Sequence, residues 1–361
     1  MSPFVASLRR EWRLLRSRPR DWAMVSWVPL LAMALMCWIF SAGQPQRLPI
    51  AVWNEDGASP LSRQLVRMLE ATPGFARDVQ RGAGASVALL HNAQLATHSS
   101  LLQRDVRQVV GTLSAGVEMQ ALAKRGTPAR ALQLRVEPIR TQLVALFNVS
   151  TNYEQFLATT LVPALVHILA MTAGAWSVGR ELRDRTLGQW LHGAGGAAAV
   201  LAALLGKLLA PLALLWASAL ACLLYLSQLR GWAVAGSLAW IALGLALLVA
   251  VSLAAGAALA GLTLSLRTAM SGAGLLSAPA FAFSGVGFPL LAMSGSARTW
   301  AEAMPYTHYA RLQIEQWQMS APPAQSLPVV AGLLLATLAL LALATVGLLR
   351  GLRRPERWGA R

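Results

Sequence analysis

The stretch that decides the fold is WIALGLALLVAVSLAAGAALAGL, which runs from Trp240 to Leu262 without a charged side chain. It exceeds the roughly 20 apolar residues that a helix needs to cross a bilayer. The whole chain of 361 residues shares this bias, because 56% of it is hydrophobic and 13% is charged, whereas soluble proteins carry about 25% charged residues. The sequence therefore predicts an α-helical integral membrane protein.

Working outward from this run, we expect six transmembrane helices. The fourth lies within residues 232–266, where Gly244, Gly256 and Gly261 suit close helix packing. The others are predicted at residues 22–42, 156–178, 208–226, 269–291 and 329–349.

The start of the third span depends on Lys207, the only charged residue between positions 197 and 226. A lysine at mid-bilayer costs roughly 2.5–3.5 kcal/mol on insertion scales. We therefore expect Lys207 at the point of membrane entry, with residues 197–206 lying along the surface as an interfacial segment.

The distribution of basic residues predicts the orientation. If the N-terminus is cytoplasmic, the inside segments hold sixteen Lys and Arg residues, and the two short outside connections hold three. By the positive-inside rule, both basic termini, residues 1–21 and 350–361, then face the cytoplasm. Because the arginines flank apolar runs, nucleic acid is not expected as a partner. The first span is too long for a cleaved signal peptide, so we expect it to remain in the mature protein as an uncleaved transmembrane helix.

Residues 43–155 then form an external, periplasmic domain, for which we expect an α+β fold. Leu48–Trp53 alternates like a strand, and Ser59 followed by Pro60 is typical of a helix start. Further elements are predicted as a strand at Ser86–Leu90, a helix at Gln94–Lys124 and a strand over Leu132–Val136.

Catalytic motifs are missing from the sequence. The only Gly-Lys pair, Gly206-Lys207, has Leu201 where a Walker A motif needs a glycine, and no HExxH, GxSxG or CxxC occurs. We expect no enzyme activity and no metal site. Cys37 and Cys222 both fall in predicted spans and are expected to form no disulfide. His167 is a possible intramembrane polar site, with a structural, hydrogen-bonded histidine as the alternative.

One predicted cytoplasmic loop, GRELRDRTLGQWLHGAGG at Gly179–Gly196, concentrates charge and then glycine. Leu187, Trp190 and Leu191 follow the charges at helical spacing, which favours a short amphipathic helix that docks on a soluble protein. The alternative is a plain basic flank of the membrane.

Several stretches resemble permeases of the ABC-2 type exporter family, in the branch with a large external domain after the first span. They are LPIAVWNEDGASPLSRQLVRMLEATP, NAQLATHSSLLQRDVRQVVGTLSAG, FNVSTNYEQFL, GRELRDRTLGQWL, LLGKLLAP, FSGVGFPLLAM and WAEAMPYTHYARLQIEQW. Near Gln80–Ala88 the chain is shorter than the family pattern, which implies either a trimmed external domain or a deletion in the gene.

The resemblance implies two sets of site residues. Glu181, Arg185, Thr186, Leu187 and Trp190 would couple residues 179–207 to an ATP-binding subunit that carries the ATP and Mg. The region 288–327 would form external re-entrant elements, with gate residues at Pro289, Met293, Trp300, Pro305 and Tyr309.

As a function, the resemblance implies the non-catalytic permease subunit of an ATP-driven exporter in a bacterial inner membrane. It would form a homodimer or pair with a paralogous permease. Membrane lipids and a periplasmic adaptor protein would be further partners. Charge reversal at Glu181 would uncouple export without preventing insertion. The alternative is a membrane scaffold or receptor that binds a partner through its external domain, above all through the helix at Gln94–Lys124.

Overall fold

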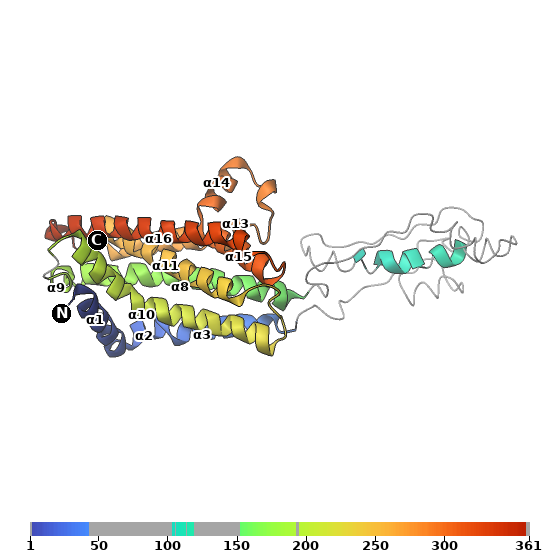
Figure 1. Ribbon diagram of the computed structural model, residues 1–361, viewed down its shortest axis with the longest axis horizontal. Helices are drawn as coiled ribbons and strands as arrows, with labels where there is room; N and C mark the ends of the chain where they lie inside the picture. The colour runs from blue at the N-terminus through green and yellow to red at the C-terminus, as the bar shows by residue number, and fades with distance from the viewer. Residues whose placement is uncertain are drawn as a thin grey trace, which may run out of the picture. The chain divides into compact units, whose positions relative to one another are not determined.

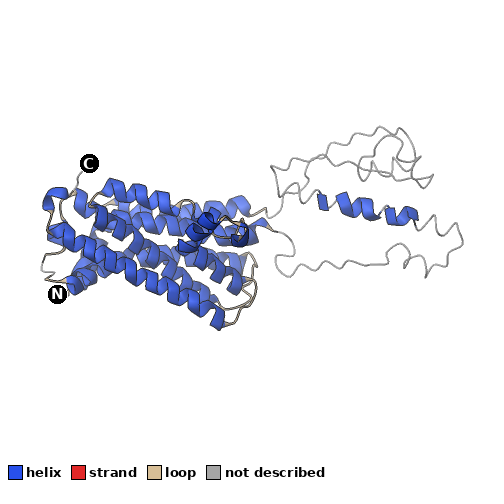
Figure 2. Cartoon of the chain, turned by 90° about the horizontal axis from the view of Figure 1, so that it is seen from above, coloured by secondary structure: helices blue, strands red, loops and turns tan. Residues whose placement is uncertain are grey.

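The computed structural model describes residues 2–42, 103–104, 106–112, 114–118, 152–192 and 195–358. The chain divides into two compact units, one of residues 1–44 and 146–361 and the other of residues 45–145. Every described element of either unit is helical, and no strand occurs among the described residues (Figure 2).

Only fragments of the second unit are described, and they are helical at 103–104, 106–112 and 114–118. They fall within the predicted helix Gln94–Lys124. The predicted strands at Leu48–Trp53, Ser86–Leu90 and Leu132–Val136, like the helix that starts near Ser59, lie outside the described residues.

The first unit is a bundle of long helices (Figure 1). Five helical stretches among the described residues are long and apolar enough to cross a membrane. They are α2 (Pro19–Val25) with α3 (Trp27–Phe40); the π-helical turn η1 (Glu154–Ala158) with α8 (Thr159–Arg183); α10 (Ala197–Leu224) with η2 (Tyr225–Leu229); α11 (Leu238–Thr263); and α16 (Pro323–Leu352).

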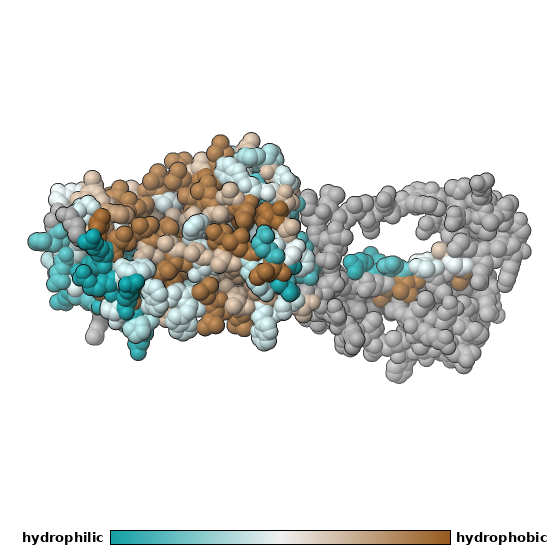
Figure 3. All heavy atoms as spheres, turned by 60° about the horizontal axis from the view of Figure 1, so that its bottom comes forward, coloured by the Kyte–Doolittle hydropathy of each residue, from teal (hydrophilic) through white to brown (hydrophobic). Residues whose placement is uncertain are grey.

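Shorter helices complete the unit. They are α1 (Pro3–Ser17), α9 (Leu187–Trp190), α12 (Leu266–Ser277), α13 (Ala280–Phe283), η3 (Leu290–Ala292), α14 (Gly295–Ala303), α15 (Pro305–Trp317) and η4 (Pro355–Arg357). Figure 3 shows a broad belt of apolar side chains across one face of the bundle and a group of hydrophilic ones at one end. The belt is the surface expected to face lipid.

The predicted fifth span at 269–291 is not one continuous helix. α12 ends at Ser277, Pro279 follows, and α13 has only four residues. Proline lacks the backbone N–H and disfavours helix in the residue before it, so the helix stops here. At 1.5 Å per residue, the 12 residues of α12 are about 18 Å long, short of the roughly 30 Å of a hydrocarbon core.

The predicted break at Lys207 is also wrong. A single helix, α10, runs from Ala197 to Leu224, and Lys207 lies inside it with its side chain fully buried. Residues 197–206 are therefore the first turns of the same helix rather than a separate interfacial segment. Ion pairs with Glu11 and Glu181 offset the cost of burying this lysine.

Close packing at glycines brings the long helices together. A Cβ atom on Gly256 of α11 would lie 2.0 Å from the carbonyl oxygen of Met171 in α8, so the two backbones touch there. Gly261 gives similar access to the backbone of α16 at Ala344. The predicted role of these small residues in helix packing is confirmed.

Candidate functional site

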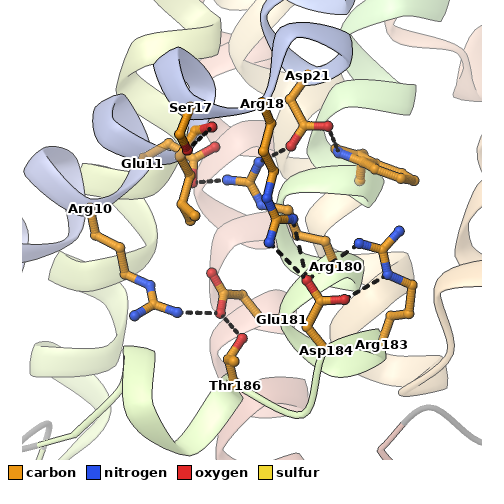
Figure 4. A network of polar contacts seen from close by, with 12 residues as sticks. Arg10, Glu11, Ser17, Arg18, Asp21, Arg180, Glu181, Arg183, Asp184 and Thr186 are labelled. Carbon is orange, nitrogen blue, oxygen red and sulfur yellow. Dashed lines mark hydrogen bonds and ion pairs between the residues drawn. The ribbon is translucent and has the colours of Figure 1, made fainter.

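The most unusual feature of the bundle is a group of buried charges where α1 packs on α8 and α10. We call Arg10, Glu11, Asp21, Arg180, Glu181 and Lys207 the charge network. Arg180 at the end of α8 reaches two acids from the start of the chain. Its Nη1 donates to Asp21 Oδ2 at 2.8 Å, and its Nη2 binds Glu11 Oε2 (Figure 4).

Lys207 joins the same group from α10. Its Nζ lies 2.9 Å from Glu11 Oε2 and 2.7 Å from Glu181 Oε1. The other oxygen of Glu181 accepts from Arg10 Nη2 at 2.9 Å and from the hydroxyl of Thr186. The network thus connects four helices: α1 and α2 at the start of the chain, α8, and α10.

The network is balanced, with three basic and three acidic side chains. Glu11, Arg180, Glu181 and Lys207 are each at most 1% exposed. Desolvating a charge costs several kcal/mol, so each buried member depends on its partners, and removing one partner from such a group costs about 3–5 kcal/mol.

Local sequence explains how α1 reaches this position. Ser2 caps the helix by accepting from the backbone N–H of Val5, and Pro3 occupies its first turn. Ser7, Glu11 and Leu15 recur every four residues and form the buried stripe. Arg9, Arg13 and Arg16 are exposed. A Cβ on Gly206 of α10 would lie 2.2 Å from the carbonyl oxygen of Phe4, so glycine permits the contact.

The end of α8 turns sharply into the loop. The Thr186 N–H donates to the Glu181 carbonyl at 2.8 Å, and the Arg185 N–H donates to the Leu182 carbonyl at 3.2 Å. This is the Schellman pattern, whose turn residue is left-handed and usually glycine. Here it is Arg185, with φ 56°, so an exposed charged side chain is held in a strained conformation.

The loop is anchored by buried residues of α9. Leu187 and Trp190 are 0% and 7% exposed. The Trp190 Nε1 donates to the hydroxyl of Ser7 at 2.8 Å, and Lys207 Nζ lies 4.5 Å from the centre of the indole ring. The apolar side of the predicted amphipathic helix therefore packs within this chain instead of presenting itself to a partner.

The outward side of the loop is polar. Arg183, Asp184, Arg185, Gln189 and His192 are exposed, and we call them the loop face. Asp184 accepts hydrogen bonds from Arg183 at 2.8 Å and from Arg18 at 3.2 Å. The Arg183 hydrogen bond is the main reason that the pKa of Asp184 is lowered from its ordinary value, so the face carries both signs of charge at neutral pH.

The five residues implied for coupling thus divide into two groups. Glu181, Leu187 and Trp190 are buried, whereas Arg185 is exposed and Thr186 is half-buried. Charge reversal at Glu181 would put a third cation between Lys207 and Arg10. That variant would disturb the fold, so our expectation that it leaves insertion intact does not fit this geometry.

The implied external gate residues differ in exposure. Pro289 and Trp300 are exposed, Met293 is half-buried, and Pro305 begins α15. Tyr309 is fully buried within the bundle, next to Gly244 of α11.

His167 lies in the core of the bundle and is fully buried. Its Nδ1 is 2.7 Å from Ser252 Oγ, and the serine hydroxyl donates to the Leu248 carbonyl. Because that hydroxyl has one proton, His167 Nδ1 is the donor of the pair. Its ring stacks on Tyr306. This environment is typical of a structural histidine.

Sequence reasoning missed Glu11 and Asp21. They are the only acidic residues among the first 21, where six arginines surround them. Glu11 also lies on the helical stripe of Ser7 and Leu15. An acid on the apolar side of a basic helix was a usable signal for a buried ion pair.

Comparison with known proteins gives one family. The model of the ABC-2 family transporter protein matches residues 72–346, about three quarters of the chain. No curated protein and no solved structure matches the sequence. Several long apolar helices and this match agree, and the chain belongs to the ABC-2 transporter family as a multi-pass membrane permease.

Proposed function

We propose that this chain is the permease subunit of an ATP-driven exporter and that its loop face docks on a separate ATP-binding subunit. The observation that carries the proposal is the charge network directly behind the loop face. It ties the end of α8 to α1 and α10 through buried ion pairs. A push on the loop would therefore move three helices together rather than bend a loose connection.

The need for a second subunit comes from the sequence. A chain without a Walker A motif lacks the loop that holds nucleotide phosphates. The ATP and Mg would be bound by the partner, and this chain would contribute no cofactor ligand. Members of a transporter family without their own ATPase site depend on such a partner for energy.

The loop face suits a protein partner. Asp184 is held by two arginines, and Arg185 projects from a turn that ordered hydrogen bonds fix. Preorganised polar groups lose little entropy on binding. The residues implied for coupling then have separate tasks: Arg185 contacts the partner, while Glu181 and Trp190 hold the loop against α1 and α10.

Helix α8 would transmit movement of the loop to the opposite end of the bundle. With η1 it forms a helical stretch of 30 residues, about 45 Å at 1.5 Å per residue. Closure of the ATP-binding subunits would shift the equilibrium between two arrangements of this helix. Two permease copies, or this chain and a close relative, would line the pathway between them in a bacterial inner membrane.

The test is affinity purification of the tagged chain from mild detergent, with identification of every co-purifying protein. A stoichiometric soluble ATPase supports the exporter. Recovery of the chain with external partners only, and no ATPase, would overturn it and favour the scaffold or receptor.

A further inference from the structure

The two cysteines of the chain lie next to each other. Cys37 in α3 and Cys222 in α10 are 185 positions apart, yet their Sγ atoms are 3.4 Å apart. Both are free thiols, and the sequence holds no other cysteine. A disulfide has an S–S bond of about 2.05 Å, so the sulfurs would need to approach by about 1.3 Å more.

The pair joins a sparsely buried helix to the bundle. α3 is buried only along the narrow stripe of Pro29, Met33 and Cys37. Beside it is a cavity of about 360 Å³, lined by both cysteines together with Met33, Ala34, Trp38 and Ala221. Small alanines let the helices approach, and the cavity leaves room for the thiols to move and for a small reagent to enter.

The pair is near the end of the bundle opposite to the charge network. One turn beyond Cys37, the carbonyl of Ser41 accepts from Arg230, which also binds Glu154 at 2.8 Å. Ser41 and Glu154 flank residues 45–145 in the sequence, so the orientation that belongs to the proposed function puts this end on the external side. Disulfides form and persist in such oxidising compartments.

The sequence alone predicts no disulfide between these cysteines, but their closeness changes that expectation. We propose that Cys37 and Cys222 form a reversible disulfide that fastens α3 to α10. The oxidant is another disulfide, such as that of an external thiol–disulfide oxidoreductase. The half-exposed Cys222 thiolate attacks it, forms a mixed disulfide and expels one thiol. The buried Cys37 thiolate then attacks Cys222 Sγ and expels the second thiol, so two electrons and two protons pass to the oxidant.

The bond would replace weak packing by a covalent link. α3 carries Leu31, Leu35 and Trp38 on its exposed side. In the reduced chain, the narrow stripe of Pro29, Met33 and Cys37 is the part of α3 that packs on the bundle. Oxidation would fix the first span against the bundle, and reduction would release it.

The test uses the purified full-length chain and glutathione disulfide. After denaturation, a polymer-linked maleimide counts the free thiols on a gel, and mass spectrometry detects bound glutathione. We expect the wild type to pass from two tags to none, without bound glutathione. C222S and C37S each keep one cysteine, which cannot form an internal disulfide. That cysteine should remain a free thiol or form a mixed disulfide with glutathione.

A wild type that keeps both thiols, or that gains glutathione as the single variants do, would overturn the proposal, since the cysteines would then be small packing residues only. A second measurement gives an independent readout. The thermal unfolding midpoint should rise on oxidation, return with dithiothreitol, and stay unchanged in C37S.

The orientation is tested separately by counting thiols in protein alkylated inside intact cells. A disulfide that forms with glutathione disulfide but is missing in cells would contradict the external position of this end. The proposal that the two cysteines can form a disulfide would be unaffected by that result. Failure of the disulfide proposal and failure of the orientation are therefore distinguishable.

Discussion

Glu11 is the residue on which most of the charge network depends, because Arg180 and Lys207 both bind its Oε2 atom. Glu11→Ala should therefore destabilise the chain by about 3–5 kcal/mol, the cost of leaving buried charges without a partner. The measurement is thermal unfolding in detergent, followed by tryptophan fluorescence. Asp184→Ala is the matched control, whose partly exposed pairs should contribute less than about 1 kcal/mol.

A charge-balanced double variant sharpens this prediction. Replacing Glu11 and Lys207 by methionine leaves two pairs, Arg10 with Glu181 and Arg180 with Asp21. The double variant should be more stable than the sum of the single losses predicts, since it strands no charge. Additive losses would contradict a network that acts as one unit.

Arg185 makes the second prediction at this scale, because its φ of 56° is unfavourable for any residue with a Cβ. Arg185→Gly should raise the stability by about 1 kcal/mol by removing the left-handed strain. Arg183→Gly, two residues earlier at the last residue of α8, should lower it by up to about 1 kcal/mol. The same sign for both variants would argue against the Schellman turn.

Among the elements, α1 is held to the bundle by a contact that only glycine permits at Gly206. Gly206→Val should displace α1, because the new side chain would overlap the backbone at Phe4. Limited trypsin digestion measures this displacement, as the α1 arginines become available for cleavage. Gly274→Val in α12, where a Cβ has open space, should leave the cleavage unchanged, and equal cleavage of both variants would refute the contact.

The elements also show what hydropathy can and cannot predict. Long apolar runs identified the membrane helices and the small residues at their contacts. The break after Ser277 was missed although Pro279 was visible, because composition alone does not report whether a helix continues through a proline. The continuity of α10 was missed because the cost assigned to Lys207 was that of a lone lysine.

The charge network could not be predicted for a related reason. Its members come from positions 10–21, 180–181 and 207, and the pairing depends on how α1 lies across the bundle. A single sequence shows which residues are charged but not which helices meet. The residues of the loop face and the buried residues that anchor the loop alternate in the sequence. Which of these side chains are buried is visible only in the structure.

For the whole molecule, the orientation predicts that the two ends of the bundle lie on opposite sides of the membrane. In a C37S/C222S background, a cysteine in place of Arg298 should react with a membrane-impermeant maleimide in intact cells. A cysteine in place of Arg13 should react only after the membrane is permeabilised. Both positions are exposed, so labelling of both in intact cells would contradict the sidedness.

The most direct test of coupling is quantitative co-purification of the ATP-binding subunit with the loop-face variant D184K/R185E. Its matched control is R298E, an exposed arginine beside a carboxylate in α14. We predict that the wild type and R298E retain the ATPase in stoichiometric amounts, whereas the loop-face variant is folded, inserted and loses it. Full retention by a folded D184K/R185E variant would contradict docking through the loop face.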